Sequence, residues 1–214
     1  MRKIPGGRFT MGRTYSIKDP LGEYESEVPS HPVDISPFRM GPTPVTVGMW
    51  LDIMRPDGKS GYAAWASQVA GVKLILPSEA QWECVAKGGK DAKYPWGNEY
   101  DDSKVWCSVK KLRSGTVAVD RLNNVFVNKF GVSDLCSNVL EWCLDGHQPY
   151  VKSFDRLGYV SVLRDPVEAG DVMCCRGGSW ADDFPVNIRC AERRRIRPHT
   201  WHDSVGFRLA AGPK

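Results

Sequence analysis

Seven cysteines are the most chemically versatile residues of this 214-residue chain: Cys84, Cys107, Cys136, Cys143, Cys174, Cys175 and Cys190. None belongs to a Cys-x-x-Cys pair, so their spacing argues against a zinc site. Most have apolar neighbours, as in Trp82-Glu83-Cys84-Val85, which is typical of buried thiols that pack as small hydrophobic side chains. We therefore expect free, buried thiols, and these fit a reducing compartment.

The histidines and carboxylates give a weaker chemical signal. His199 and His202 are three residues apart in a loop-like stretch, a spacing that suits a metal, but no third ligand accompanies them, so we expect a surface or contact role. Asp134, Glu141 and Asp145 could bring carboxylates together at an enzyme site, and structural caps explain them as well. The sequence contains no Gly-x-Ser-x-Gly, phosphate loop or zinc-protease motif.

The overall composition is that of an ordinary globular domain. Hydrophobic residues make up 42% and charged residues 25%, and the net charge of +4 is too small to imply a nucleic-acid or membrane partner. There is no secretory leader pattern and no long apolar run, so we expect a soluble, cytoplasmic chain without a membrane span. The 21 Gly and 15 Pro predict many turns and few long helices.

Local patterns predict short elements separated by long irregular stretches. Short strands are expected after the turn at 4–7, at 31–35, at 172–176 and at 206–210. Helices are expected from Thr46, over 62–70, and from Ser78, where Ser78 and Gln81 form a capping box and Gly88-Gly89 ends the helix. Residues 99–130 are expected to be irregular and 146–171 rich in loops. No repeat or linker divides the chain, which predicts one domain over 1–214.

A series of short motifs spans nearly the whole chain: Ile4-Pro5-Gly6-Gly7, Glu27-Val28-Pro29-Ser30-His31-Pro32-Val33, Leu76-Pro77-Ser78-Glu79-Ala80-Gln81-Trp82-Glu83, Tyr94-Pro95-Trp96-Gly97, Ser137-Asn138-Val139-Leu140-Glu141-Trp142, Arg176-Gly177-Gly178-Ser179-Trp180 and Gly206-Phe207-Arg208. In this order they resemble the formylglycine-generating-enzyme (sulfatase-modifying-factor) family. The resemblance implies an α+β, C-type-lectin-like fold with little regular secondary structure, few short helices and short antiparallel strands.

The resemblance also assigns roles to single residues. Trp82, Trp96, Trp142 and Trp180 are expected to supply large buried area. The Asn that matches Asn138 helps bind a structural calcium in the family, and calcium takes oxygen ligands. Two roles stay open for Asn138: a ligand of a structural calcium, and a residue that caps a turn.

The family oxidase holds copper with two cysteines that follow the Arg-Gly-Gly-Ser motif, and this chain lacks both. The matching positions fall on Asp182 and Asn187, and Cys190 is the only thiol after Cys175. One thiol cannot supply the paired soft ligands that copper(I) prefers. The resemblance therefore implies a chain that is not an enzyme and requires no cofactor.

The segment from Ala181 to Ser204 has neither strand alternation nor a helical stripe, and it lies between two well-matched motifs. Regular frameworks commonly carry binding loops in this way. The arrangement resembles the variable proteins of diversity-generating retroelements of prokaryotes or phages, in which template adenines are randomised, mostly in asparagine codons. Randomised codons of this kind cannot yield Lys, Gln, Met, Glu or Trp. The segment contains no Lys, Gln or Met, but it does contain Glu192 and Trp201, which need other template codons.

On this resemblance the chain is a non-enzymatic display protein that binds varied protein or other macromolecular ligands through about 180–205. Fixed supports are expected at Arg189, Cys190, Ala191, Arg193 and Pro198. The ligand contacts are expected at Ala181, Asp182, Asp183, Phe184, Asn187, Ile188, Arg194, Arg195, Ile196, Arg197, His199, Thr200, Trp201, His202, Asp203 and Ser204.

Three alternatives remain for the same segment. The run Arg193–Arg197 is basic, but the acidic neighbours Asp182, Asp183, Glu192 and Asp203 indicate a mixed, solvated surface, so nucleic-acid binding is not expected. The surface could instead have a fixed protein-binding or structural role in a non-catalytic relative of the family. A copper-dependent oxidase is the third alternative and requires a different alignment of the motifs.

Overall fold

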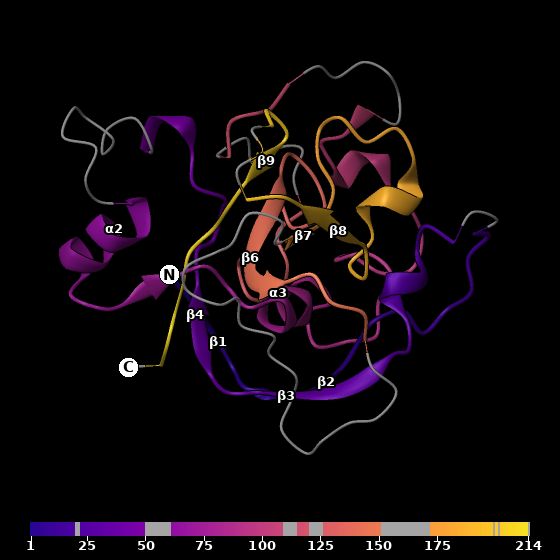
Figure 1. Cartoon of the computed structure of the whole chain (residues 1–214), viewed down its shortest axis with the longest axis horizontal. Coiled ribbons are helices and arrows are strands. Elements are labelled where there is room, and N and C mark those ends of the chain that lie inside the picture. Colours follow the sequence, from indigo (N-terminus) through magenta and orange to yellow (C-terminus); the bar gives the residue numbers. More distant parts are fainter. Residues whose placement is uncertain are drawn as a thin grey trace.

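Figure 1 shows the fold of the chain as a computed structural model, which describes residues 1–19, 22–49, 61–108, 115–119, 126–150, 172–198, 200 and 202–213. The helices described from end to end are α2 (Tyr62–Ala70) and α3 (Glu79–Ala86), and the 3-10 turns described are η1 (Glu25–Glu27), η2 (Asp102–Lys104) and η4 (Pro185–Ile188). A further helix starts at 47–49 and continues outside the described residues. The strands are β1 (Arg2–Ile4), β2 (Gly7–Met11), β3 (His31–Ile35), β4 (Phe38–Met40), β5 (Leu74–Ile75), β6 (Leu140–Gly146), β7 (Met173–Arg176), β8 (Arg193–Ile196), β9 (Val205–Gly206) and β10 (Ala210–Ala211).

Helix α3 lies in the middle of the molecule, and every residue of it except Gln81 is buried. The predicted capping box is confirmed: the Ser78 side chain accepts a hydrogen bond from the Gln81 N–H at 3.1 Å, and the Gln81 side chain accepts one from the Ser78 N–H at 2.9 Å. The helix ends as predicted, because Gly88 and Gly89 adopt φ values of 62° and 70°, which glycine tolerates without a steric penalty.

The described strands form three sheets that surround α3. The orders are β1-β4-β10-β5, β2-β3 and β8-β7-β6-β9. Strands β2, β3, β6 and β7 all contact α3, and Trp82, Val85 and Ala86 of that helix belong to the largest cluster of buried apolar side chains. One central helix therefore connects the sheet that carries the C-terminal segment to the rest of the core.

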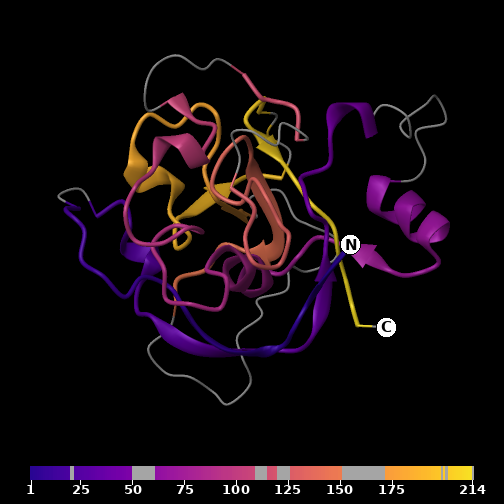
Figure 2. The same cartoon turned by 180° about the vertical axis from the view of Figure 1, so that it is seen from behind.

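The two ends of the chain meet on one strand. β1 and β10 both pair antiparallel with β4, and Arg2 and Ala210 both lie opposite Met40. Figure 2 shows both ends beside this sheet, and α2 at the same end of the molecule. Helix α2 packs Tyr62 and Ala66 on Leu74 and Leu209. Neither of the described helices is long and apolar enough to cross a membrane.

Most of the predicted elements are present. The strands expected near the N-terminus, at 31–35 and at 172–176 are β2, β3 and β7, and the helix expected over 62–70 is α2. The helix expected from Thr46 begins there, since the Thr46 side chain accepts a hydrogen bond from the Met49 N–H at 3.1 Å. Trp50 and Ile53 lie outside the described residues, as does most of the loop-rich stretch 146–171.

Two sequence predictions about strands are wrong. The segment 181–204 contains a strand, β8, whose pattern the sequence hides because its one buried position is Arg193 instead of an apolar residue. The strand expected at 206–210 is divided between two sheets, with β9 parallel to β6 and β10 paired with β4 and β5. Arg208 lies between them, and its buried guanidinium donates to Glu141 Oε2 at 2.6 Å.

The predictions for cysteine and tryptophan have different outcomes. All seven cysteines are free and buried, as expected, and burial raises the pKa of Cys84 to about 11. Trp82 is completely buried, but Trp96, Trp142 and Trp180 are only partly buried. The motif tryptophans other than Trp82 therefore contribute less to the core than we expected.

Candidate ligand-binding site

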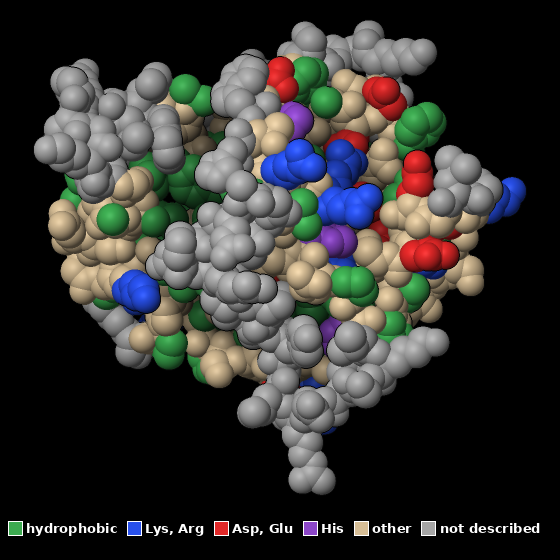
Figure 3. Space-filling view, viewed as in Figure 1, with side chains coloured by type: hydrophobic (Ala, Val, Ile, Leu, Met, Phe, Trp, Pro, Cys, Tyr) green, Lys and Arg blue, Asp and Glu red, His purple; other side chains and the backbone are tan. Residues whose placement is uncertain are grey.

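Strand β8 forms one wall of a polar cleft of about 700 Å³. The other wall comes from the segment before η1, and its lining residues are Gly22, Glu23, Tyr24, Ser26, His147, Asn187, Glu192, Arg193, Arg194 and Arg195. Figure 3 shows Lys, Arg and His side chains gathered on this face over β7 and β8, with acidic side chains toward the rim. The C-terminal segment thus meets an N-terminal loop at a surface that is rich in hydrogen-bond donors.

The arginines of β8 differ in how far they are buried. β8 pairs antiparallel with β7, with Arg176 opposite Arg193 and Cys174 opposite Arg195. Arg193 is buried, Arg194 is half-buried and Arg195 is exposed. Arg193 and Arg195 lie on the same side of the strand, so alternation does not separate them. Arg193 is buried by its contacts with Glu79 and Ser26, whereas Arg195 forms no ion pair with a described residue. The basic run therefore divides into an anchoring residue and residues that are available to a ligand.

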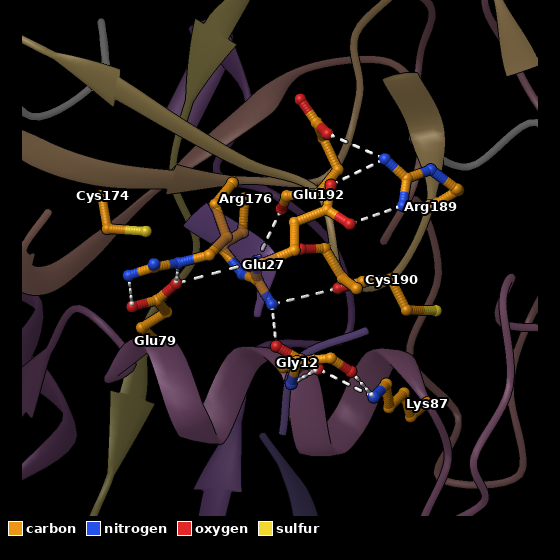
Figure 4. A network of polar contacts seen from close by, with 12 residues as sticks. Gly12, Glu27, Glu79, Lys87, Cys174, Arg176, Arg189, Cys190 and Glu192 are labelled. Atoms are coloured by element: carbon orange, nitrogen blue, oxygen red, sulfur yellow. Dashed lines mark hydrogen bonds and ion pairs between the residues drawn. The ribbon is translucent and has the colours of Figure 1, made fainter. Parts of the chain in front are cut away.

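A network of buried ion pairs holds the backbone of this segment. Arg176 of β7 contacts Glu83 of α3 and donates to the carbonyl oxygens of Cys190 and Glu192 at 3.0 and 2.6 Å (Figure 4). Glu83 also contacts the Lys87 ammonium at 2.9 Å. These groups lie in the protein interior, away from water. In the interior an ion pair or hydrogen bond is strong, and an unpaired charge is costly. The network therefore ties the chain before β8 to the central helix.

Arg189 forms a second anchor with the N-terminal part of the chain. Its guanidinium donates two hydrogen bonds to the Glu27 carboxylate of η1, at 2.7 and 2.6 Å, and both side chains are fully buried. A bidentate arginine–carboxylate pair fixes direction as well as distance. Arg189, Cys190, Ala191 and Arg193 are all buried, as expected for fixed supports, while Pro198 is half-buried.

Arg193 joins β8 to α3 and to the far wall of the cleft. It donates to Glu79 Oε2 at 2.9 Å and to the Ser26 carbonyl oxygen at 2.7 Å, and it lies 4.0 Å from the centre of the Tyr150 ring. Burial alone would raise the pKa of Glu79, but Arg193 and Arg176 outweigh it and hold that pKa at about 2. Glu79 is therefore a permanent anion that keeps both arginines in place.

Two titratable groups at the cleft have strongly shifted pKa values. Burial, together with a hydrogen bond and repulsion from Glu27, raises the pKa of Glu192 to about 8. Burial, together with the nearby Arg193, lowers the pKa of His147 to about 4. At neutral pH the site therefore presents a protonated carboxyl and an uncharged imidazole beside exposed arginines.

The structure divides the sixteen predicted contact residues by exposure. Eight are exposed: Ala181, Asp183, Phe184, Arg195, Arg197, Thr200, His202 and Asp203. Four are half-buried, namely Asn187, Arg194, Ile196 and Ser204, and His199 and Trp201 lie outside the described residues.

Two of the predicted contact residues are buried, and for them the prediction is wrong. Ile188 is 0% exposed and packs in the main apolar cluster. Asp182 is 5% exposed; it pairs with Arg194 and accepts a hydrogen bond from the Ser179 N–H at 2.7 Å. Both residues act as supports, because an enclosed side chain cannot touch a ligand while the fold is intact.

The contact residues do not all gather at the cleft. Asn187, Arg194 and Arg195 line it, whereas the Ser204 carbonyl oxygen accepts a hydrogen bond from the Leu140 N–H at 2.9 Å, beside β9. β8 and β9 are the two edge strands of the same sheet. The segment therefore crosses from one edge of that sheet to the other.

Asn138 makes the contacts of a turn residue. Its φ is 65°, its side-chain oxygen accepts from the Val117 N–H at 3.0 Å, and its side-chain nitrogen donates to the Val117 carbonyl oxygen at 3.1 Å. Within the described ranges, no three His, Cys, Asp or Glu side chains come together to hold a metal ion. The structural calcium stays a prediction, and the observed contacts of Asn138 match the second role, a residue that caps a turn.

Of the three carboxylates considered for an enzyme site, Asp134 and Glu141 both lie near Arg208, whereas Asp145 has other surroundings. Asp145 accepts a hydrogen bond from the Glu79 N–H at the start of α3, at 2.6 Å, and Glu141 pairs with Arg208. Asp134 is buried, and burial raises its pKa to about 6. Two of the three are thus structural, as caps or ion-pair partners.

Sequence reasoning missed one whole wall of the cleft. The stretch from Ser16 to Ser30 reads only as a polar surface loop, yet Tyr24 donates to the Asn187 side-chain oxygen at 2.8 Å and Glu23 lines the cleft. His147 was also missed. A local pattern cannot show that residues more than 160 positions apart are neighbours. The family motif that begins at Glu27 was the one sequence signal that pointed to this wall of the cleft.

The raised pKa of Glu192 predicts a stability change above neutral pH. The folded state holds this proton up to about pH 8, whereas the unfolded chain releases it near pH 4.5, so stability is lost as the pH rises through this window. Between pH 6.5 and 8 we expect this group to cause a loss of about 1–2 kcal/mol in the free energy of unfolding. Above pH 8 the buried thiols, whose pKa values are also raised, add a further loss. The raised pKa values of Asp134 and Asp145 lie near 6, below this range.

Urea denaturation at pH 6.5, 7, 7.5 and 8 measures this effect below the range in which the buried thiols contribute. Glu192→Gln should flatten the pH dependence, because the amide is neutral throughout. Glu23→Gln, on the exposed rim, should leave it unchanged. A pH profile of the Glu192→Gln variant that matches the parent protein would show that another group titrates.

Comparison with known proteins gives a family and several relatives. The family described as the sulfatase-modifying factor enzyme 1-like domain matches residues 57–212. The serine/threonine-protein kinase Pkn1 of Chlamydia trachomatis is 34% identical over 158 residues, which cover 73% of this chain and 23% of that protein. The inactive C-alpha-formylglycine-generating enzyme 2 of Mus musculus is 31% identical over 163 residues, which cover 70% of this chain and 45% of that protein.

Among solved structures, variable protein 1 of Treponema denticola has a TM-score of 0.79 at 21% sequence identity. The match covers 100% of this chain and 95% of that one. This likeness shows a shared fold. The chain spans about a quarter of the length of the kinase that it matches.

Proposed function

Since the chain belongs to the sulfatase-modifying factor family, we propose that it uses the fold of that family for ligand binding without catalysis. The exposed side chains of the C-terminal segment contact the ligand, and a retroelement diversifies them. The sequence resemblance to retroelement variable proteins and the shared fold with Treponema denticola variable protein 1 support the proposal. The similarity to an inactive formylglycine-generating enzyme of mouse supports its non-catalytic part.

One observation carries the proposal: anchoring and exposed positions are interleaved within a single segment. Arg189 and Arg193 are held in the interior by Glu27 and Glu79, while Phe184 is 64% exposed and Arg195 is exposed. Surface substitutions away from special contacts usually change stability by less than about 0.5 kcal/mol. A segment built in this way tolerates new side chains at its exposed positions while its backbone stays in place.

The non-catalytic part of the proposal follows from the residues at the two positions that match the copper-binding cysteines of the family oxidase, and from the burial of the one nearby thiol. Asp182 is paired with Arg194, Asn187 accepts a hydrogen bond from Tyr24, and Cys190 is 0% exposed. A completely enclosed thiol cannot exchange with a substrate thiol. An oxygen-consumption assay with a thiol-containing peptide and copper should therefore give the rate of the buffer control. Turnover that Cys190→Ser abolishes would establish an oxidase instead.

Simultaneous replacement of the exposed residues should leave the fold intact. We expect a variant with Asp183, Phe184, Arg195 and Arg197 all changed to alanine to differ from the parent protein by less than about 1 kcal/mol in the free energy of unfolding. The reason is that none of these side chains belongs to the buried network. Thermal and urea unfolding measure the change, and Arg189→Ala is the matched control that should be far less stable.

Selection from a library tests the binding role directly. The exposed positions are randomised, the proteins are displayed, and binders are selected against a protein unrelated to this chain, such as lysozyme. We expect folded binders whose affinity depends on the randomised residues. A matched library randomised at Arg176, Arg189 and Arg193 should give no folded binders. If the first library gives none either, the segment has a fixed role, and the search turns to one dedicated partner.

A further inference from the structure

Among the strands that the structure describes, β8 lies at the edge of its sheet. The order β8-β7-β6-β9 gives it one described strand neighbour, β7. In an antiparallel pair, every second residue turns its N–H and C=O away from the partner strand. Among the described residues, no hydrogen bond reaches the backbone of 193–196 from outside the β7 pairing. An edge of this kind is a template for another strand.

The cleft runs along this edge. Four consecutive residues line it, from Glu192 to Arg195. Successive side chains of a strand point to opposite faces of the sheet, so a cleft that meets all four of these residues must follow the edge of the strand. The four residues of β8 span about 13 Å, and the opposite wall, Gly22 to Ser26, leaves about 700 Å³ between them. This space has the shape that an extended peptide needs.

The charges at the cleft favour an acidic side chain on that peptide. Arg193 is balanced by Glu79, and Arg194 by Asp182. Arg195 is exposed and forms no ion pair with any described residue. Glu23 on the opposite wall disfavours a ligand with dense negative charge, such as a nucleic acid. A peptide with separated acidic residues meets Arg195 without crowding Glu23.

We propose that the edge of β8 binds an extended peptide segment as an additional antiparallel or parallel strand, with an acidic side chain of the peptide beside Arg195. The inference rests on the proposed function and deepens it by naming the kind of ligand. Backbone hydrogen bonds would supply an affinity common to many ligands, and the exposed side chains would select among them. The buried network of Arg176 and Arg193 keeps the edge in one position while those side chains change.

Three blocked peptides of equal length test the proposal by calorimetry and by NMR of the full chain. The first alternates valine and glutamate, the second alternates valine and lysine, and the third is the first with alternate amides N-methylated. We expect the glutamate peptide to bind with a Kd below about 1 mM and to shift the amide signals of 193–196. The lysine and N-methylated peptides should bind at least about tenfold more weakly.

Two charge reversals locate the acidic contact. Arg195→Glu should weaken the glutamate peptide and strengthen the lysine peptide, each by about tenfold. Arg197→Glu is the matched control, since Arg197 is exposed but does not line the cleft, and it should change either affinity by less than about threefold. Equal effects of the two reversals would mean diffuse charge attraction and would overturn the assignment to Arg195.

Other outcomes also decide against the proposal. No binding of the glutamate peptide at 5 mM, on the order of the weakest affinity measurable, or equal binding of its N-methylated form, rules out strand addition. A single-stranded oligonucleotide that binds more tightly than the peptide identifies a nucleic-acid surface. If library-selected ligands bind the exposed segment without shifting the signals of 193–196, this inference fails and the proposed function stands. If the library yields no binders, the proposed function itself fails.

Discussion

Replacing Arg176 with leucine should lower the free energy of unfolding by about 3–5 kcal/mol, the usual cost of removing one partner from a buried ion pair. Arg176 is 0% exposed. Leucine would leave Glu83 with Lys87 and the Gly12 N–H, and the carbonyl oxygens of Cys190 and Glu192 would lose their donor in the interior. Urea denaturation at pH 7 measures the loss.

Two further variants separate the charge network from other effects of the substitution. Arg176→Lys keeps the charge but lacks the planar fork that reaches a carboxylate and carbonyl groups together, so most of the loss should remain. Arg195→Leu lies on the neighbouring strand at an exposed position and should change stability by less than about 0.5 kcal/mol. A loss below about 1 kcal/mol for Arg176→Leu would show that the network does not hold the segment.

Gly178→Ala should cost about 2–3 kcal/mol, because the segment packs directly on this glycine. A Cβ atom at position 178 would lie 2.2 Å from Ile188 Cγ2 and 2.9 Å from Ile188 Cβ. Ile188 is itself completely buried, so it cannot move outward without pulling η4 from the core. The glycine before the segment thus sets how closely the chain from 185 to 188 approaches the sheet.

A double-mutant cycle tests this contact specifically. Ile188→Ala removes Cγ2, so Gly178→Ala should cost less in that background, by about 1 kcal/mol. Gly212→Ala is the control, because no atom lies within 4 Å of the added Cβ. Strictly additive losses in the cycle would mean that the cost of Gly178→Ala arises elsewhere, for example from the backbone.

The sequence predicted the fold where local chemistry and motif order agree. The capping box at Ser78 and the two glycines after α3 act within a few residues, so their pattern is complete in the sequence. The strand at 31–35 has ordinary alternation. These elements required no knowledge of distant partners.

Sequence reasoning failed where a charged side chain replaces an apolar one in the interior. Arg193 faces inward on β8 because Glu79 of α3 neutralises it there, and a run of arginines gives no sign of such a partner. The buried position of Ile188 depends on Gly178, ten residues earlier. Asp182 was expected at the surface because aspartate is commonly exposed, but Arg194 and Ser179 satisfy it inside.

The candidate site was therefore predicted in location and only partly in content. The C-terminal segment does supply one wall of the cleft, through Asn187, Arg194 and Arg195. The other wall, with Glu23 and Tyr24, is remote in sequence and has no motif of its own. The two walls meet because Arg189 of the C-terminal segment binds Glu27 in η1 and Arg193 of β8 donates to the Ser26 carbonyl oxygen.

The most direct test of diversified ligand binding is the DNA sequence that flanks the gene. The proposal predicts a nearby repeat of the coding region for 176–207, beside a reverse-transcriptase gene. The two copies should differ only at template adenines, in codons for exposed positions such as Asp183, Phe184, Arg195 and Arg197. Absence of any repeat, or differences at the codons of the buried Arg176, Arg189 and Arg193, would contradict it.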